Sequence, residues 1–185
     1  VDRLLKSPVK QRGRDFVVML ACLSELGYVV EWRVINAAEY GMPQRRRRVF
    51  IMAHKRGTEQ HRILSRKKVN AIQWLTENGT IAKAFPVHPE PETILIEHSL
   101  LAEGEDIADL SERFNKNGLP GNRSPFENSG IMSNNRYWTL RTRPMFEGAH
   151  QNLSDVLLTP GKVPDEYLLS AASLTQEKGW KYLKG

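Results

Sequence analysis

The stretch between residues 44 and 52 constrains the fold most, because four consecutive arginines run directly into an apolar segment. Such a segment predicts a β-strand. Side chains of an extended chain alternate between two faces, so Gln44, Arg46 and Arg48 are expected to share one face with Phe50. Burying arginine is costly unless acidic or phosphate-like groups meet it, and the pattern therefore predicts a polar binding site.

The residues from Asn36 to Phe50 resemble one known family. Their order, Asn-Ala-x-x-Tyr-Gly-x-Pro-Gln-x-Arg-x-Arg-x-Phe, is similar to the arginine-rich signature of the cytosine-C5 DNA methyltransferases. A helix and Leu-Gly-Tyr precede this block in the family, and Leu26 to Tyr28 match them. The alternative interpretation of the block is a solvated basic hairpin with an ordinary proline turn.

The resemblance implies an enzyme that transfers a methyl group from S-adenosylmethionine to carbon 5 of a flipped cytosine in duplex DNA. By the same resemblance, Arg48 matches the arginine that contacts O2 of the base. Arg46 matches the arginine that supports the loop of the catalytic cysteine, and Gln44 matches the glutamine that leads the block. These three are the candidate catalytic residues.

Other parts of the family's machinery are missing from the sequence. The family's nucleophile lies in a Pro-Cys element, whereas Cys22 lies within an amphipathic helical pattern and is interpreted as a small core residue. We find no Phe-x-Gly-x-Gly cofactor loop, so no residue is assigned to S-adenosylmethionine, and the chain is expected to bind it poorly. The chain begins with Val1 rather than methionine, and we expect an inactive fragment of a longer protein.

Composition agrees with a polyanionic partner. The formal net charge is +6 and the isoelectric point is about 9.5. One cysteine excludes an internal disulfide, and the scattered histidines give no spacing typical of metal ligands. No apolar run reaches membrane-spanning length and no signal peptide is evident, which predicts a soluble, cytoplasmic protein without a membrane partner.

Local patterns predict the first elements. Periodic apolar residues indicate a helix that starts at Arg14 and is capped by Gly27. Residues 28–35 are rich in β-branched and aromatic side chains and predict a strand, and a second strand is expected over about 46–53. Shorter helices are expected at residues 71–77 and after Asp106, Asn152 and Pro164.

Three prolines between Phe85 and Pro91 predict a linker and a domain boundary. We assign residues 1–85 to the C-terminal part of the catalytic domain and residues 86–185 to a partial target recognition domain. The expected fold class is an α/β fragment of a Rossmann-like methyltransferase domain, followed by an α+β target recognition domain.

A hairpin is expected around Ser133-Asn134-Asn135, because asparagine tolerates the left-handed conformation of tight turns. Arginine and asparagine suit base edges and phosphates. The candidate DNA-binding residues are therefore Asn134, Arg136, Arg141 and Arg143. The alternative interpretation is a solvated hairpin face.

Three other functions stay open. A related branch of the family methylates tRNA, but a sizeable region after residue 86 favours DNA. The chain could instead be a binding-only module, such as one subunit of a split enzyme, or a nonspecific basic nucleic-acid binder. A partner restriction endonuclease is a possible companion, and the sequence indicates neither the recognised bases nor the oligomeric state.

Overall fold

Strand β1 (Tyr28–Asn36) is buried along almost its whole length and organises the fold. The computed structural model describes residues 2–159 and 161–168. The chain forms two compact units, which meet between His150 and Gln151 in the sequence. The helices and helical turns of the first unit are η1 (Asp2–Lys6), α1 (Arg14–Glu25), η2 (Ala37–Tyr40), α2 (Glu59–Leu64), α3 (Ala71–Gln73), the π-helical turn η3 (Trp74–Asn78), α4 (Thr80–Ala84), α5 (Ile107–Arg113) and η4 (Pro120–Asn122). Its other strands are β2 (Arg47–Lys55), β3 (Val87–Pro89), β4 (Ile96–Ser99), β5 (Ser129–Ser133), β6 (Arg136–Leu140) and β7 (Thr142–Pro144).

The strands form two antiparallel sheets. The larger sheet has the order β2-β1-β5-β6-β4, and β3 pairs with β7 in the smaller one. Along the β1–β2 hairpin, Asn36 lies opposite Arg47 and Tyr28 lies opposite Lys55. The fold is thus mixed α/β, and the larger sheet joins strands from before and after residue 86. The assignment of residues 1–85 and 86–185 to two domains stays a prediction.

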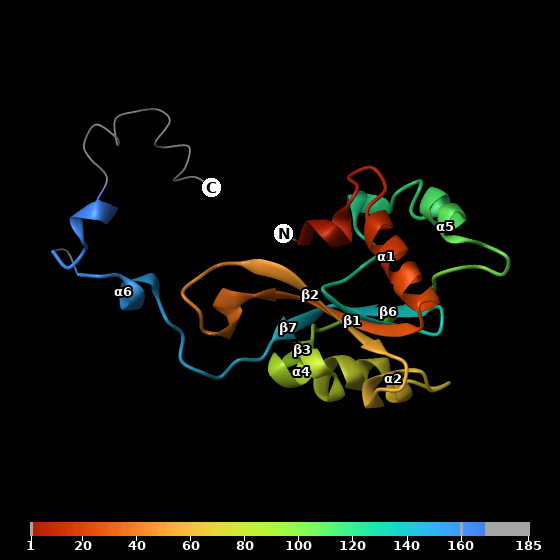
Figure 1. Ribbon diagram of the computed structural model, residues 1–185, viewed down its shortest axis with the longest axis horizontal. Coiled ribbons are helices and arrows are strands. Elements are labelled where there is room, and N and C mark those ends of the chain that lie inside the picture. The colour runs from red at the N-terminus through yellow and green to blue at the C-terminus, as the bar shows by residue number, and fades with distance from the viewer. Residues whose placement is uncertain (1, 160, 169–185) are drawn as a thin grey trace. The chain divides into compact units, whose positions relative to one another are not determined.

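Helices cover both faces of the larger sheet (Figure 1), and each face has its own hydrophobic core. One core packs α1 and α5 against the sheet, and its aromatic centre is Trp32, whose ring meets Phe16 and Phe126 edge to face at 5.1 and 5.8 Å. The other core packs α2, α3 and η3 against the opposite face, with Trp74 and Leu140 among its buried residues. Because β1 is covered on both sides, most of its side chains are apolar, and the buried Glu31 and Arg33 are held by hydrogen bonds.

Several local predictions are confirmed. Helix α1 ends before Gly27, which has a left-handed φ of 76°, and the Asn70 side chain caps α3 by accepting a bond from the Gln73 amide at 3.0 Å. The β5–β6 hairpin turns through Asn134 and Asn135, whose φ angles are 50° and 60°. Two successive positive φ angles define the turn whose twist matches that of paired strands.

Two expectations are wrong. The stretch expected to be a linker contains β3, in which Val87 pairs with Pro144 and Pro89 pairs with Thr142. Proline is compatible with such a short edge pairing because few ladder amides are needed. Cys22 is exposed rather than in the core, because it lies on the face of α1 opposite to the buried Phe16 side.

The second unit contains two short elements in its described part. Helix α6 (Leu153–Val156) starts at Asn152, which forms a capping box with Asp155, as the sequence predicts. The helical turn η5 (Asp165–Tyr167) follows Pro164. The last part of the predicted recognition domain, residues 169–185, lies outside the described residues. Within the described residues, no helix is long and apolar enough to cross a membrane.

A buried carboxylate fixes the second layer of helices against the sheet. Glu31 is 2% exposed and accepts hydrogen bonds from the Trp74 indole at 3.2 Å and from the backbone amides of Thr80 and Ile81 at 3.1 and 3.3 Å. His54 of β2 contacts the same carboxylate at 2.9 Å. Burial alone would raise the pKa of Glu31, but these hydrogen bonds hold it below its ordinary value of 4.5.

Gly130 gives the first test of this packing. Its Cα lies so close to the Trp32 ring that an added Cβ would overlap the indole, while its own φ is not left-handed. We expect Gly130→Ala to lower the free energy of unfolding by about 1–3 kcal/mol through overpacking. Urea denaturation measures this loss. Gly118→Ala is the control, because an added Cβ there meets nothing and costs only the left-handed strain, about 1 kcal/mol; equal losses would contradict the packing argument.

Glu31 gives the second test. We expect Glu31→Gln to lower the free energy of unfolding at pH 7 by about 3–5 kcal/mol, because one amide cannot accept from all the donors around the carboxylate. The folded pKa lies below the unfolded one, so the carboxylate's contribution is fully present above about pH 5 and is lost as the pH falls through the folded pKa. The difference in the free energy of unfolding between wild type and variant, measured by urea denaturation, is therefore expected to become smaller from pH 6 to pH 3. Glu77→Gln, on the exposed side of η3, is the matched control, and a difference independent of pH would contradict the assignment.

Candidate nucleic-acid interface

The turn between β1 and β2 carries the candidate catalytic residues. After the helical turn η2, Gly41 takes a left-handed φ of 82°, and the Met42 amide donates to the Ala37 carbonyl at 3.2 Å. The Ala37 amide donates in turn to the Arg46 carbonyl at 3.1 Å. These bonds close the loop so that β2 starts at Arg47.

Aromatic packing holds this turn from outside the hairpin. The Tyr40 ring meets Phe85 and Phe146 at 5.1 and 6.0 Å, and its hydroxyl donates to the Pro86 carbonyl at 3.1 Å. A Cβ on Gly41 would lie 2.6 Å from the Ala149 carbonyl oxygen, so only glycine fits there. Segments far along the chain therefore determine where the arginines of the turn lie.

A buried arginine supports the same turn from below. Arg33 is 2% exposed and donates to the carbonyls of Phe85, at 2.6 Å, and Leu75. Burial lowers the pKa of Arg33, while the neighbouring Tyr40 and Glu31 act in the opposite direction. Burial raises the pKa of Tyr40, so its hydroxyl stays a neutral donor.

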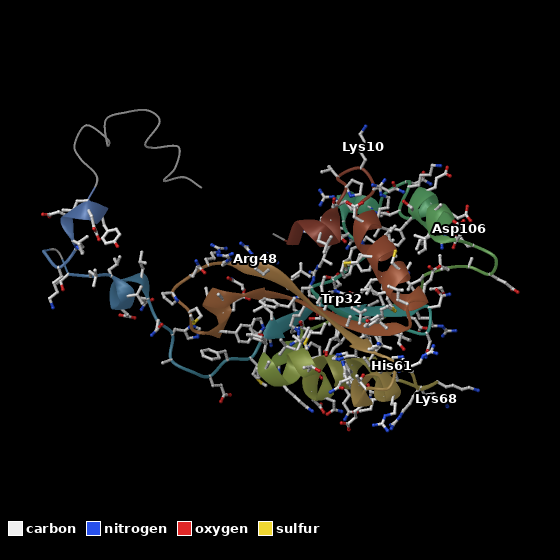
Figure 2. All side chains as sticks on the ribbon, viewed as in Figure 1. Lys10, Trp32, Arg48, His61, Lys68 and Asp106 are labelled. Carbon is white, nitrogen blue, oxygen red and sulfur yellow. The ribbon has the colours of Figure 1, made fainter. Side chains whose placement is uncertain are left out.

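The three candidate catalytic residues lie in different local structures. Gln44 and Arg46 are exposed loop residues before β2, so the expected alternation of faces does not extend to them. Arg48 lies within the strand opposite Ile35, half-buried, with its Nη1 donating to the Arg47 carbonyl at 2.8 Å (Figure 2). Within the described residues, neither Arg46 nor Arg48 forms an ion pair with a carboxylate.

A cavity of about 540 Å³ lies beside the arginine block. Its basic lining residues outnumber its acidic ones: Lys6, Arg12, Arg47, Arg123, Arg141 and Arg143 against Glu39, Glu90 and Glu127. Two further polar atoms, the Nε of Arg12 and the Oδ1 of Asn36, are buried without a hydrogen-bond partner among the described residues. The cavity can therefore offer both donors and an acceptor to an anionic or polar group.

The four candidate DNA-binding residues fall into two separate groups. Arg141 and Arg143 line the cavity, where Arg141 pairs with Glu127 at 3.0 Å. Asn134 and Arg136 lie at the other end of β6, where Asn134 donates to the Ser65 carbonyl at 3.0 Å. Arg136 pairs there with Glu97 at 2.9 Å. The hairpin therefore does not present one continuous binding face.

Sequence reasoning missed part of the cavity. Asn36 and Arg47 lie within the motif from Asn36 to Phe50, but their contribution depends on the register of β1 with β2, which brings the two opposite each other. Arg12 precedes the start of α1 and belongs to no periodic pattern. Its place in the lining of the same cavity as Arg143 could not be predicted from the sequence, because it depends on the meeting of distant segments.

The described residues offer no evident cofactor site. No group of three or more His, Cys, Asp or Glu residues among them could hold a metal ion. The turns that lead from strands to helices contain single glycines, such as Gly57 after β2 and Gly104 before α5, rather than a glycine-rich loop.

Comparison with known proteins identifies the family. The C-5 cytosine-specific DNA methylase family matches residues 1–156. The chain is 40% identical to the type II methyltransferase M.Sau3AI of Staphylococcus aureus, over all of this chain and 40% of that protein. It is 42% identical to M.MthTI of Methanothermobacter thermautotrophicus over 44% of the chain and 22% of that protein, and 44% identical to M.NlaIV of Neisseria lactamica over 25% and 11%. The chain thus spans less than half the length of these relatives, and no solved structure matches it. The 185 residues belong to the C-5 cytosine-specific DNA methylase family.

Proposed function

We propose that this chain is part of a DNA (cytosine-5)-methyltransferase that modifies a flipped cytosine in duplex DNA. One observation carries the proposal: Arg46, just before β2, and Arg48, within it, have no carboxylate partner among the described residues, and Arg47 between them lines a cavity together with Arg141 and Arg143. Guanidinium groups that meet no carboxylate are available to phosphates and carbonyl oxygens.

In this proposal, Arg48 donates to O2 of the flipped cytosine and stabilises the negative charge that gathers on the ring when a thiolate attacks carbon 6. Arg46 supports the loop that carries the thiolate, and Gln44 orients the start of the block. Cys22 is not assigned as the nucleophile, because it lies within α1 and not in a Pro-Cys element like that of the family. The nucleophile and the site of the methyl donor, which the family takes from S-adenosylmethionine, are assigned to other parts of a longer protein.

We infer that β1 and β2 belong to a Rossmann-like sheet that continues in that protein. Among the described strands, β2 pairs with β1 alone, so its other edge is open. Phe50 and Met52 of β2 are 45% and 38% exposed, and natural proteins normally cover such an edge. Residues 86–185 then supply part of the target recognition domain, through Arg141 and Arg143 at the cavity.

The type II relatives suggest a partner. M.Sau3AI, M.MthTI and M.NlaIV are all named type II methyltransferases. We therefore expect the longer enzyme to protect host DNA against a restriction endonuclease that recognises the same sequence. Genomic neighbourhood and co-purification would identify such an endonuclease.

Arg48 gives the decisive test. In the longer enzyme, Arg48→Ala is expected to lower kcat for methyl transfer to duplex DNA by about 100- to 1,000-fold, because one donor to the developing charge is lost. Arg48→Lys is expected to restore little, because a single ammonium lacks the planar fork. Transfer of labelled methyl groups measures both.

The exposed neighbour Arg45 is the matched control, and Arg45→Ala is expected to keep most of the activity. Equal losses at both positions would contradict the role of Arg48. Methylation of tRNA but not duplex DNA by the wild type would assign the RNA branch instead. If the intact longer protein is inactive on both substrates, the result would favour a binding-only module.

Arg143 tests the role of the cavity. Arg143→Ala is expected to weaken the binding of duplex DNA by the longer enzyme about tenfold, because Arg143 lines the cavity. Arg136→Ala is expected to have little effect on DNA affinity, because Arg136 already pairs with Glu97. Fluorescence anisotropy at fixed salt compares the two variants, and a larger loss for Arg136→Ala would reverse the assignment.

A further inference from the structure

A second basic surface lies away from the candidate interface. We define the α2 basic surface by its six cationic side chains, Lys55, Arg56, Arg62, Arg66, Lys67 and Lys68. All six are exposed, and Glu59 is the single acidic residue between residues 55 and 68. Figure 2 shows Lys68 beyond α2, whereas Arg48 lies towards the other end of β2.

The cations of this surface are not neutralised. Within residues 2–159 and 161–168, none of the six forms a salt bridge. Elsewhere in the same unit, exposed basic residues do meet carboxylates: Arg113 pairs with Glu105, Lys116 with Glu112 and Arg136 with Glu97. This surface gathers six exposed cations without a salt bridge among the described residues into residues 55–68, against one carboxylate.

The surface is also held in place. Thr58 caps α2 by accepting a bond from the His61 amide at 3.2 Å. At the far end of the helix, the Asn134 side chain of the β5–β6 hairpin donates to the Ser65 carbonyl at 3.0 Å, directly before Arg66. The three consecutive cations from Arg66 to Lys68 thus start from a fixed backbone position.

The surface is distinct from the arginine block. The arginine block ends at Arg48 in β2, and Lys55 is the last residue of the same strand, so the seven residue steps between them span roughly 24 Å at about 3.4 Å per residue. This separation is several times the Debye length of about 8 Å at physiological salt, so the two sets of charges act independently. The α2 basic surface therefore does not serve the flipped base.

We propose that the α2 basic surface binds the phosphate backbone of duplex DNA independently of sequence. This inference rests on the proposed function for the identity of the polyanion as DNA. Unpaired lysines and arginines in a row suit phosphates, and such contacts release counterions and make affinity steeply dependent on salt. The surface would hold the protein on DNA while the recognition site is sought.

The test uses the 185-residue chain and a 30-base-pair duplex, with affinity measured by fluorescence anisotropy from 50 to 200 mM salt. The triple variant Arg66→Ala, Lys67→Ala, Lys68→Ala is expected to lower the slope of log affinity against log salt by about 2.7, at about 0.9 per lost contact. Over this salt range, three contacts correspond to about a 40-fold change in affinity. A scrambled duplex is expected to give the same result.

Two variants control the experiment. Lys10→Ala, Lys116→Ala, Lys162→Ala removes the same net charge from other exposed positions and is expected to change the slope little. Arg66→Lys, Lys67→Arg, Lys68→Arg keeps the charge and is expected to keep the slope. Circular dichroism establishes that all variants are folded.

Equal effects of the two alanine triples, or no DNA binding by the wild type at 50 mM salt, would overturn the inference. Binding of polyglutamate that the Arg66–Lys68 triple abolishes, with an unchanged DNA slope, would overturn it in favour of an acidic protein partner. These outcomes are separate from the proposed function, which depends on methyl transfer by the longer enzyme and on Arg48. Methyl transfer sensitive to Arg48 together with an unchanged DNA slope would reject the surface alone.

Discussion

Burial of β1 on both faces is the constraint on which the rest of the structure depends. One face presents Trp32 to an aromatic core, and the other presents Glu31 and Arg33 to the segment from α3 to α4. Buried charges add little net stability, but they require particular partners in particular places. The carboxylate therefore fixes the start of α4 and the guanidinium fixes the carbonyls of Leu75 and Phe85, so the helical layer has one register against the sheet.

The position of this helical layer also determines the position of the arginine block. Phe85 follows α4 and packs on Tyr40, whose hydroxyl donates to the next carbonyl, that of Pro86. Phe146 closes the other side of the same turn. Because the turn is held by segments that also lead into β3 and out of β7, a shift of either would move Arg46 and Arg48 together. The chemistry proposed for the block thus depends on packing well outside the motif.

Features that depend on neighbouring residues could be predicted from the sequence. The cap at Asn70 and the turn at Asn134 need only local chemistry, and the structure contains both. Features that depend on distant segments could not be predicted. Cys22 lies on a helix whose periodic pattern does not predict which residues beside the apolar face are buried. Likewise, β3 replaces the expected linker because β7 supplies a partner more than fifty residues later.

The ion pairs of the hairpin arginines also could not be predicted from the sequence. Arg141 and Arg143 share a face by alternation and line one cavity, yet Arg141 is neutralised by Glu127 and Glu90. Those glutamates come from a different strand end and a different loop, which no pattern in residues 136–144 indicates. A phosphate that approached Arg141 would have to compete with both carboxylates, so this arginine is suited to shaping the cavity. Arg143 is the arginine of this pair that can meet a phosphate without first breaking an ion pair, because its guanidinium has none among the described residues. Neutralisation by distant carboxylates, rather than residue type, therefore separates structural arginines from those free to bind.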